Sequence, residues 1–367
     1  MVATVSRKRT ILGQSASKTG GLFHKNPQMV QINEMRGVAA LLVVLFHAVG
    51  SEPELATSFL GELIQRFAFV RMPLFIAISG YLYGVQRGTR PLTFASWYKR
   101  SRRIVPPFLL VTIVCWIISA KGGVPFSLIT GIVFGAWHLW YLQALVVILL
   151  AVAVLETVVR PKNWHLLFWT IGAFLISASG IFSEVTWLSV HKAVYLLPYF
   201  FAGAAFGAMP QLFKDWQNRY VIYVLGIIAI AMHEVLLAGV VAPWANVPVI
   251  AGVMGVASFL TLAFHMPANN TFRCVGAHSL PIFLWHLPLS ALTSFLLLNP
   301  LSVDGHVSAF TKIVVGTTLP IAMSMMVARV APGMVIFVGK RAISHLPAVP
   351  SPLISVVHVT VPARLYP

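Results

Sequence analysis

The sequence predicts an all-α protein that crosses a membrane about ten times, with both termini in the cytoplasm. Three observations lead to this fold class. Of the 367 residues, 58% are hydrophobic and only 10% are charged, whereas soluble domains carry about 25% charged residues. Apolar runs of helical length recur from residue 33 to residue 338. The basic residues gather between alternate runs, as is typical of cytoplasmic loops.

The composition also excludes other classes of protein. So many apolar residues are incompatible with a disordered chain and argue against a soluble enzyme. The formal net charge of +17 would suggest nucleic-acid binding in a soluble chain. In a membrane protein the same excess marks cytoplasmic loops, so we expect no nucleic-acid partner. Cys115 and Cys274 lie in or beside apolar runs and imply no disulfide framework.

Polar segments flank the apolar part of the chain. Residues 1–30 are basic, and we expect a mostly disordered cytoplasmic tail. The alternative is a signal peptide with a cleavage site at Ala48-Val49-Gly50, but the polar stretch before the apolar run is unusually long for that pattern. We expect residues 31–340 to form one membrane domain and residues 341–367 to form a second cytoplasmic tail.

Ten apolar runs approach the length of about 20 residues that a membrane-spanning helix needs. The first, third and sixth runs are short, and the last could break at Pro332-Gly333. The runs are residues 33–50, 68–86, 104–120, 136–159, 165–183, 193–209, 220–239, 247–266, 279–298 and 313–338.

The loop charges support this number of spans. With the N-terminus in the cytoplasm, twenty of the 26 Lys and Arg residues fall on the cytoplasmic side and Arg329 lies inside the last run. The five on the opposite side are Arg66, Arg71, Lys121, Lys192 and Lys312. One span more or fewer would exchange the sides of half the loops and remove the bias.

The first span carries Arg36 and His47 with no charged residue between them. Eleven helical steps bring the two side chains to one face, about 16 Å apart along the axis. Ionisable groups within a span usually face a cavity or the bundle interior. A neutral imidazole can take a proton from a hydroxyl. Alternatively, Arg36 is an anchor at the cytoplasmic interface and His47 forms a hydrogen bond to a neighbouring helix.

The second span contains Arg71, Ser79 and Gly80. Arg71 could extend to water at the outer interface or face the same cavity as His47. Ser79 and Gly80 suit either close helix packing or a contact with substrate.

A basic loop follows, with Lys99, Arg100, Arg102 and Arg103 at the cytoplasmic mouth of the third span. The pattern fits either positive-inside topology with anionic lipid or a phosphate site. Arginine binds phosphate oxygens in pairs, and the phosphates of coenzyme A would suit such a cluster.

Histidines occur again in the fourth and ninth spans. His138 and Tyr141 are three residues apart, so in a helix they would share a face. They could also belong to an aromatic belt at the interface. His286 lies beside Pro288, at a helix kink. We expect no metal, because there is no H-x-x-x-H pair and few acids could complete a site.

Five segments, taken in chain order, resemble the motifs of the acyltransferase family 3 membrane proteins, which are O-acyltransferases of bacterial surface carbohydrates and of some lipids and antibiotics. The motifs occupy about 45 of the residues between 30 and 340. The segments are Glu34-Met-Arg36 to His47, Met72-Pro-Leu-Phe to Leu82, Lys99-Arg100-x-x-Arg103-Ile-x-Pro106, His138-Leu-Trp-Tyr-Leu142 and Leu284-Trp-His286-x-Pro288.

The resemblance implies an enzyme of the cytoplasmic (inner) membrane. It would move an acyl group, most simply acetyl, from cytoplasmic acyl-CoA to a hydroxyl of a surface polysaccharide, such as an exopolysaccharide or lipopolysaccharide, or of a glycolipid. His47 would be the essential histidine and Arg36 its partner. The CoA phosphates would be bound by Lys99, Arg100 and Arg103. Acetyl-CoA is then a substrate, and no permanently bound cofactor is expected.

The sequence departs from the family pattern at two positions. Position 71 is Arg where relatives often carry His, and position 33 is Asn where an acid is common. Many relatives also carry an appended hydrolase-like domain, so we expect this chain to act alone or with a separate partner. Cys115 could be a covalent relay, although its apolar setting disfavours the thiolate. Two other functions remain open: a transporter or flippase, and a non-catalytic subunit of polysaccharide assembly.

Overall fold

The computed structural model describes residues 27–121, 125–159, 162–211, 219–237, 247–263, 265, 267 and 269–339. Every regular element in these ranges is a helix, which confirms the all-α class. Short 3-10 helices cover residues 187–189 and 332–334, and a π-helical turn covers residues 294–298. The α-helices are α2 (Pro27–Gly50), α3 (Pro53–Ala56), α4 (Phe59–Arg66), α5 (Ala68–Arg87), α6 (Phe94–Lys121), α7 (Leu128–Phe134), α8 (Trp140–Val159), α9 (His165–Ser179), α10 (Val190–Ala208), α11 (Arg219–Leu237), α12 (Val247–Ala263), α13 (Asn270–Ala277), α14 (Ser279–Thr293), α15 (Gly305–Val330) and α16 (Val335–Val338).

Each of the ten predicted apolar runs overlaps a helix of the structure. Within the described residues, six helical segments are long and apolar enough to cross a membrane, and three further apolar helices are shorter. The six are Met29–Gly50, Phe59–Arg87, Phe94–Lys121, Trp140–Val159, Ser279–Leu298 and Gly305–Val330. These helices confirm a polytopic membrane protein, while the number ten and the cytoplasmic location of both termini stay predictions.

The predicted tails lie almost wholly outside the described residues. Only residues 27–30 of the first tail are described, and they already belong to α2. The last predicted run does break near Pro332, because α15 ends at Val330.

Two predicted boundaries were wrong. The basic segment that we expected to be a loop lies inside α6, which begins at Phe94. The Thr93 side chain accepts a hydrogen bond from the backbone N–H of Ser96 at 3.3 Å, which favours this early start. The fourth span begins at Trp140 rather than at residue 136, because Trp137 has a positive φ of 48° that a helix cannot accommodate.

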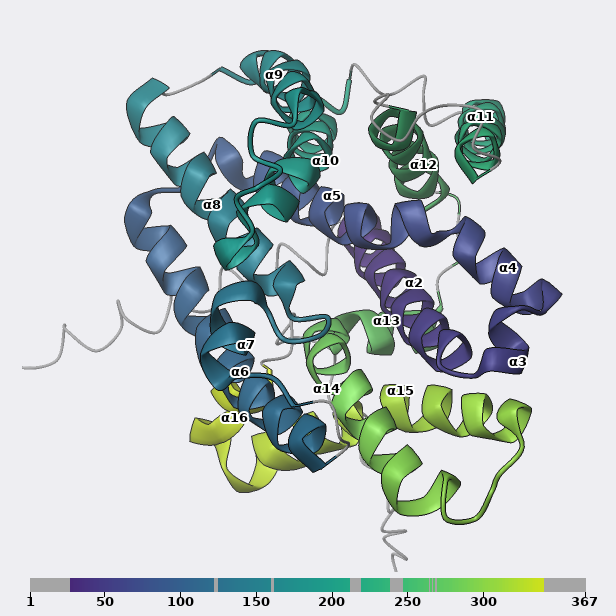
Figure 1. Ribbon diagram of the computed structural model, residues 1–367. Coiled ribbons are helices and arrows are strands. Elements are labelled where there is room, and N and C mark those ends of the chain that lie inside the picture. Colours follow the sequence, from purple (N-terminus) through teal and green to yellow (C-terminus); the bar gives the residue numbers. More distant parts are fainter. Residues whose placement is uncertain are drawn as a thin grey trace, which may run out of the picture.

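Helix α2 lies in the middle of the bundle, where it packs against α5, α13, α14 and α15 (Figure 1). Its first residues lie against α13, and its later residues lie near α14 and α15. A cleaved signal peptide would not occupy this position. Consequently, Arg36 and His47 project from the central helix of the bundle.

Helices α5 and α10 form the closest helix pair. Gly80 and Gly84 of α5 lie directly against backbone carbonyls of α10, and Gly203 and Gly207 of α10 lie against backbone carbonyls of α5. Small residues at such positions let two helix backbones approach closely in a membrane. Any side chain at these four positions would collide with the partner backbone.

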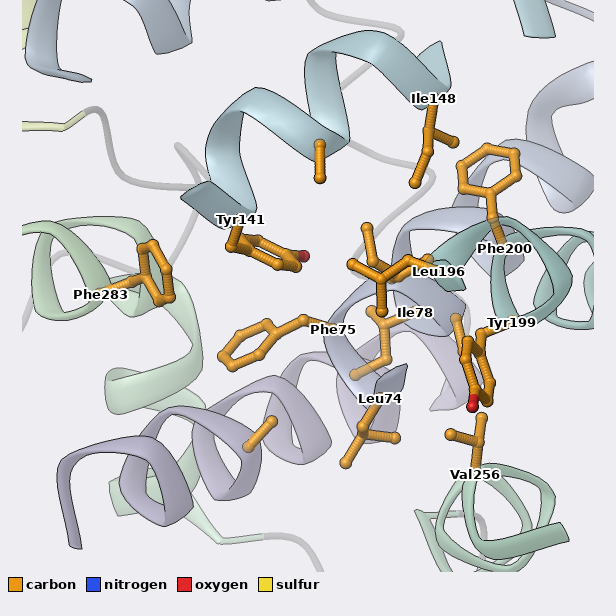
Figure 2. Close-up of a cluster of buried hydrophobic side chains, with 14 of the residues drawn as sticks. Leu74, Phe75, Ile78, Tyr141, Ile148, Leu196, Tyr199, Phe200, Val256 and Phe283 are labelled. Carbon is orange, nitrogen blue, oxygen red and sulfur yellow. The ribbon is translucent and has the colours of Figure 1, made fainter. Parts of the chain in front are cut away.

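An aromatic cluster joins three helices of the bundle. Figure 2 shows Phe75 of α5, Tyr141 of α8 and Phe283 of α14 grouped together. The ring centroids of Tyr141 and Phe283 are 5.1 Å apart, and Phe75 lies 6.0 Å from Tyr141. These spacings are typical of favourable aromatic contacts. The cluster holds α5, α8 and α14 in fixed positions around α2.

Within the described residues, four ion pairs join segments that are far apart in the sequence. In each pair, both residues belong to the same side of the membrane in the predicted ten-span topology. The pairs are Glu34–Arg273 and Arg87–Glu156 on the predicted cytoplasmic side, and Glu52–Lys312 and Arg66–Glu234 on the predicted outer side. This agreement favours the predicted alternation of the loops.

Candidate active site

Arg36 lies in the interior of the bundle, among polar groups from three other helices. Its Nη2 donates a hydrogen bond to the Ser279 hydroxyl at the start of α14, over 3.0 Å. Tyr141 of α8 interacts with Arg36 and hydrogen-bonds with Ser79 of α5. These neighbours favour an interior role for Arg36 over that of an anchor at the membrane surface.

Three histidines meet near the carboxyl end of α2. The ring centroid of His47 lies 5.3 Å from that of His286 and 6.5 Å from that of His138. The His138 and His286 rings are 4.7 Å apart. Both are almost fully buried, whereas His47 is half-buried. Among the described residues, no set of three His, Cys, Asp or Glu side chains is arranged to hold a metal ion.

His138 reaches this cluster from a turn and not from a helix. It lies in the turn before α8, so the predicted helical face shared with Tyr141 is wrong. The two side chains nevertheless converge on one ring, because each lies 5.1 Å from Phe283. The turn therefore directs His138 toward α14.

An open pocket of about 360 Å³ leads to His47 from the predicted outer side. Its wall includes Trp137, Ser51 and Lys312. The Lys312 ammonium donates hydrogen bonds to Glu52 at 2.5 Å and to Ser51 at 2.9 Å. A half-buried histidine at the base of an open pocket is accessible to a substrate from that side.

Arg71 lies beside His47 and the preceding Phe46. Its guanidinium carbon is 3.3 Å from the centroid of the Phe46 ring, a cation–π contact. It is also within electrostatic range of His47. Its buried Nε has no hydrogen-bond partner among the described residues. Of the two predicted locations, the structure therefore favours the one near His47.

The predicted phosphate site is a helical face. Because α6 begins at Phe94, Arg103 lies three residues after Arg100 and four after Lys99, so it neighbours both on the helix surface. Lys99 and Arg103 are exposed and Arg100 is half-buried. Arg102 neighbours Lys99 but points away from Arg100, by about 160° around the helix axis, and its guanidinium carbon is 5.7 Å from the Tyr98 ring centroid.

A buried ion pair adjoins this helical face. The Arg87 Nε donates a hydrogen bond to Glu156 at 2.5 Å, and both side chains are less than a tenth exposed. The Tyr83 hydroxyl donates to the same carboxylate, and Tyr83 lies within electrostatic range of Arg100. Arg87 and Glu156 also line an open pocket of about 430 Å³.

The predicted site residues therefore form three groups. Four meet near the carboxyl end of α2: His47, Arg71, His138 and His286. Three meet at the middle of the bundle: Arg36, Ser79 and Tyr141. Lys99, Arg100 and Arg103 lie on α6.

Sequence reasoning missed Ser279, Glu156 and Lys312. A serine or a single charge near the end of an apolar run is too common to identify a site. Their partners, Arg36, Arg87 and Glu52, are distant in the sequence.

Comparison with known protein families gives one match. The model of a family described as an acyltransferase domain matches residues 29–329. This range includes all the site residues named above. No curated protein and no solved structure matches the chain.

Proposed function

Since the chain belongs to this acyltransferase family and is a multi-pass membrane protein, we propose that it moves an acyl group from cytoplasmic acyl-CoA to a hydroxyl outside. The acyl group is acetyl, and the hydroxyl belongs to a surface polysaccharide or a glycolipid. The protein acts in the cytoplasmic membrane. The observation that carries the proposal is the accessible, half-buried His47 on the central helix that also carries Arg36.

His47 acts as the general base. The hydroxyl oxygen of the acceptor attacks the carbonyl carbon of the thioester, and His47 takes the hydroxyl proton. The carbon–sulfur bond breaks, and the departing thiolate takes the proton from the imidazolium. A cation, Arg71 or Arg36, stabilises the negative charge that develops on the carbonyl oxygen. Both substrates meet at one histidine, so no acyl-enzyme forms.

The donor enters from the opposite side. The phosphates of coenzyme A bind to Lys99, Arg100 and Arg103, because arginine forms paired hydrogen bonds with phosphate oxygens. The pantetheine arm extends into the bundle past Arg36, which lies about 16 Å from His47 along α2. The acceptor hydroxyl enters through the pocket that Trp137 and Lys312 line.

Mass spectrometry of surface glycans tests the proposal. Glycans from cells that contain the protein are compared with glycans from cells that lack it. The proposal expects a fraction that is heavier by one acetyl group, and only in cells that contain the protein. A larger mass increment would show that the transferred acyl group is longer than acetyl. A change in the amount of glycan without any change in mass would refute acyl transfer to the glycan and favour a transporter.

A further inference from the structure

His286 is held in α14 in a way that determines which ring nitrogen carries its hydrogen. Its Nδ1 lies 2.9 Å from the carbonyl oxygen of Phe283 and 3.0 Å from that of Ile282. A carbonyl oxygen can only accept a hydrogen bond, so Nδ1 must be the donor. In the neutral ring, Nε2 is then left with a lone pair and can only accept.

This acceptor has no donor. The His286 side chain is only 1% exposed, and its Nε2 has no hydrogen-bond partner among the described residues. Buried polar atoms without a partner are rare and costly in proteins. Gly316 of α15 lies against the Cβ of His286, so α15 covers the residue from that side. The missing donor must therefore come from another side of the ring, and the His47 and His138 rings lie close to it.

Two histidine rings are close enough to supply this donor without a substrate. The His138 ring centroid lies 4.7 Å from that of His286, but a neutral His138 carries one N–H, which interacts with the backbone of Phe283 and Leu284. The remaining donor is His47. Its ring centroid is 5.3 Å from that of His286, and the His47 ring makes no hydrogen bond within the described part of the chain. A small rotation of the half-buried His47 side chain, or one bridging water, closes such a gap; catalytic hydrogen bonds are often long before substrate binds. Of the charged groups near His47, Arg71 can also donate, but its guanidinium is held over the Phe46 ring, and Lys312 is paired with Glu52.

We infer that His286 is a positioning residue for His47, an inference that rests on the proposed function. The Nε2 of His286 accepts a hydrogen bond from one ring N–H of His47. The other His47 nitrogen is then unprotonated and available to the acceptor hydroxyl. When His47 has taken the hydroxyl proton, the same hydrogen bond stabilises the imidazolium until the proton passes to the departing thiolate.

Two substitutions at one position separate this role from packing. His286→Asn places an amide N–H near Nδ1 and keeps the bonds to the α14 carbonyls, but it removes Nε2. His286→Gln reaches further and places an amide acceptor near Nε2. Each variant is assayed in inside-out membrane vesicles from cells that lack the native copy, with radiolabelled acetyl-CoA as the probe and incorporation into vesicle glycan as the readout.

We expect His286→Asn to lower kcat by about 10- to 150-fold, the value of one hydrogen bond to a charged group. The KM for acetyl-CoA stays unchanged, because His286 does not touch the donor phosphates. His286→Gln retains most of the rate, and both variants unfold at the temperature of the wild-type protein. A wild-type rate in the Asn variant, or equal losses in both variants, overturns the inference.

A direct measurement covers the case in which the Asn variant does not fold. Nitrogen-15 NMR of the histidine-labelled wild-type protein, with the His286→Gln protein to assign the signal, reports which ring nitrogen is protonated. A proton on Nε2 overturns the inference.

The His47→Ala variant, assayed in the same kind of membrane vesicles, separates the positioning role of His286 from the proposed function. If that variant is active, the proposed function fails. If it is inactive while His286→Asn is fully active, only the positioning role fails.

Discussion

Replacement of Ser279 by alanine tests whether Arg36 must be held in place for transfer. The Ser279 hydroxyl is 2% exposed and accepts the hydrogen bond of Arg36 at 3.0 Å. A hydrogen bond to a charged group contributes about 1.5–3 kcal/mol, or about 10- to 150-fold in rate. Tyr141 stays beside the guanidinium in the variant, so we expect the lower end of this range, a loss of about 10-fold in kcat/KM.

The assay is acetyl incorporation from labelled acetyl-CoA in membrane vesicles, at matched protein amounts. Ser279→Thr is the control, because it keeps the hydroxyl and should retain most of the activity. A wild-type rate in Ser279→Ala would show that this hydrogen bond does not position Arg36 during transfer. Equal losses in the Ala and Thr variants would mean that side-chain shape at the start of α14 matters, and not the hydroxyl.

Three other predictions concern the remaining parts of the site and the fold. His47→Ala should lower acyl transfer by roughly 10²–10⁴-fold without changing the amount of protein in the membrane; near-normal transfer would contradict its role as general base. Arg100→Ala should raise the KM for acyl-CoA by about 10-fold, measured at fixed salt, whereas Arg102→Ala, which removes a cation that points away from Arg100, should change it less; equal effects would exclude a specific phosphate site. Glu156→Ala should lower the free energy of unfolding by about 3–5 kcal/mol, because it removes the carboxylate that pairs with the buried Arg87. Denaturant unfolding in detergent checks this loss, and Glu156→Gln, which keeps a hydrogen-bond acceptor, should lose less.

The positions of the helices could be predicted from the sequence because the bilayer imposes a simple rule on length and composition. All ten apolar runs overlap helices. The errors arose where local chemistry decides the boundary. The third apolar run begins only at residue 104, yet the helix of 28 residues begins at Phe94 and continues through Pro106. The start of α8 was placed too early because nothing in the apolar pattern reveals the positive φ of Trp137.

The site could be predicted only in part. One helix carries both Arg36 and His47, so their spacing alone placed them on one face. His286 and Ser279 reach the same helix from more than two hundred residues away, and hydropathy contains no information on which spans are neighbours. The Arg87–Glu156 pair was missed for the same reason, because each residue alone is an ordinary charge near the end of a span.

The glycine contacts between α5 and α10 restrict how this protein can move. Where two backbones touch without intervening side chains, neither helix can slide or rotate without a collision between carbonyl groups. The pair should therefore behave as a single rigid body, so that Arg71 and Ser79 of α5 keep a fixed position relative to α10. Any motion that admits the substrates must leave this helix pair intact, and crosslinks between α5 and α10 should leave turnover unchanged.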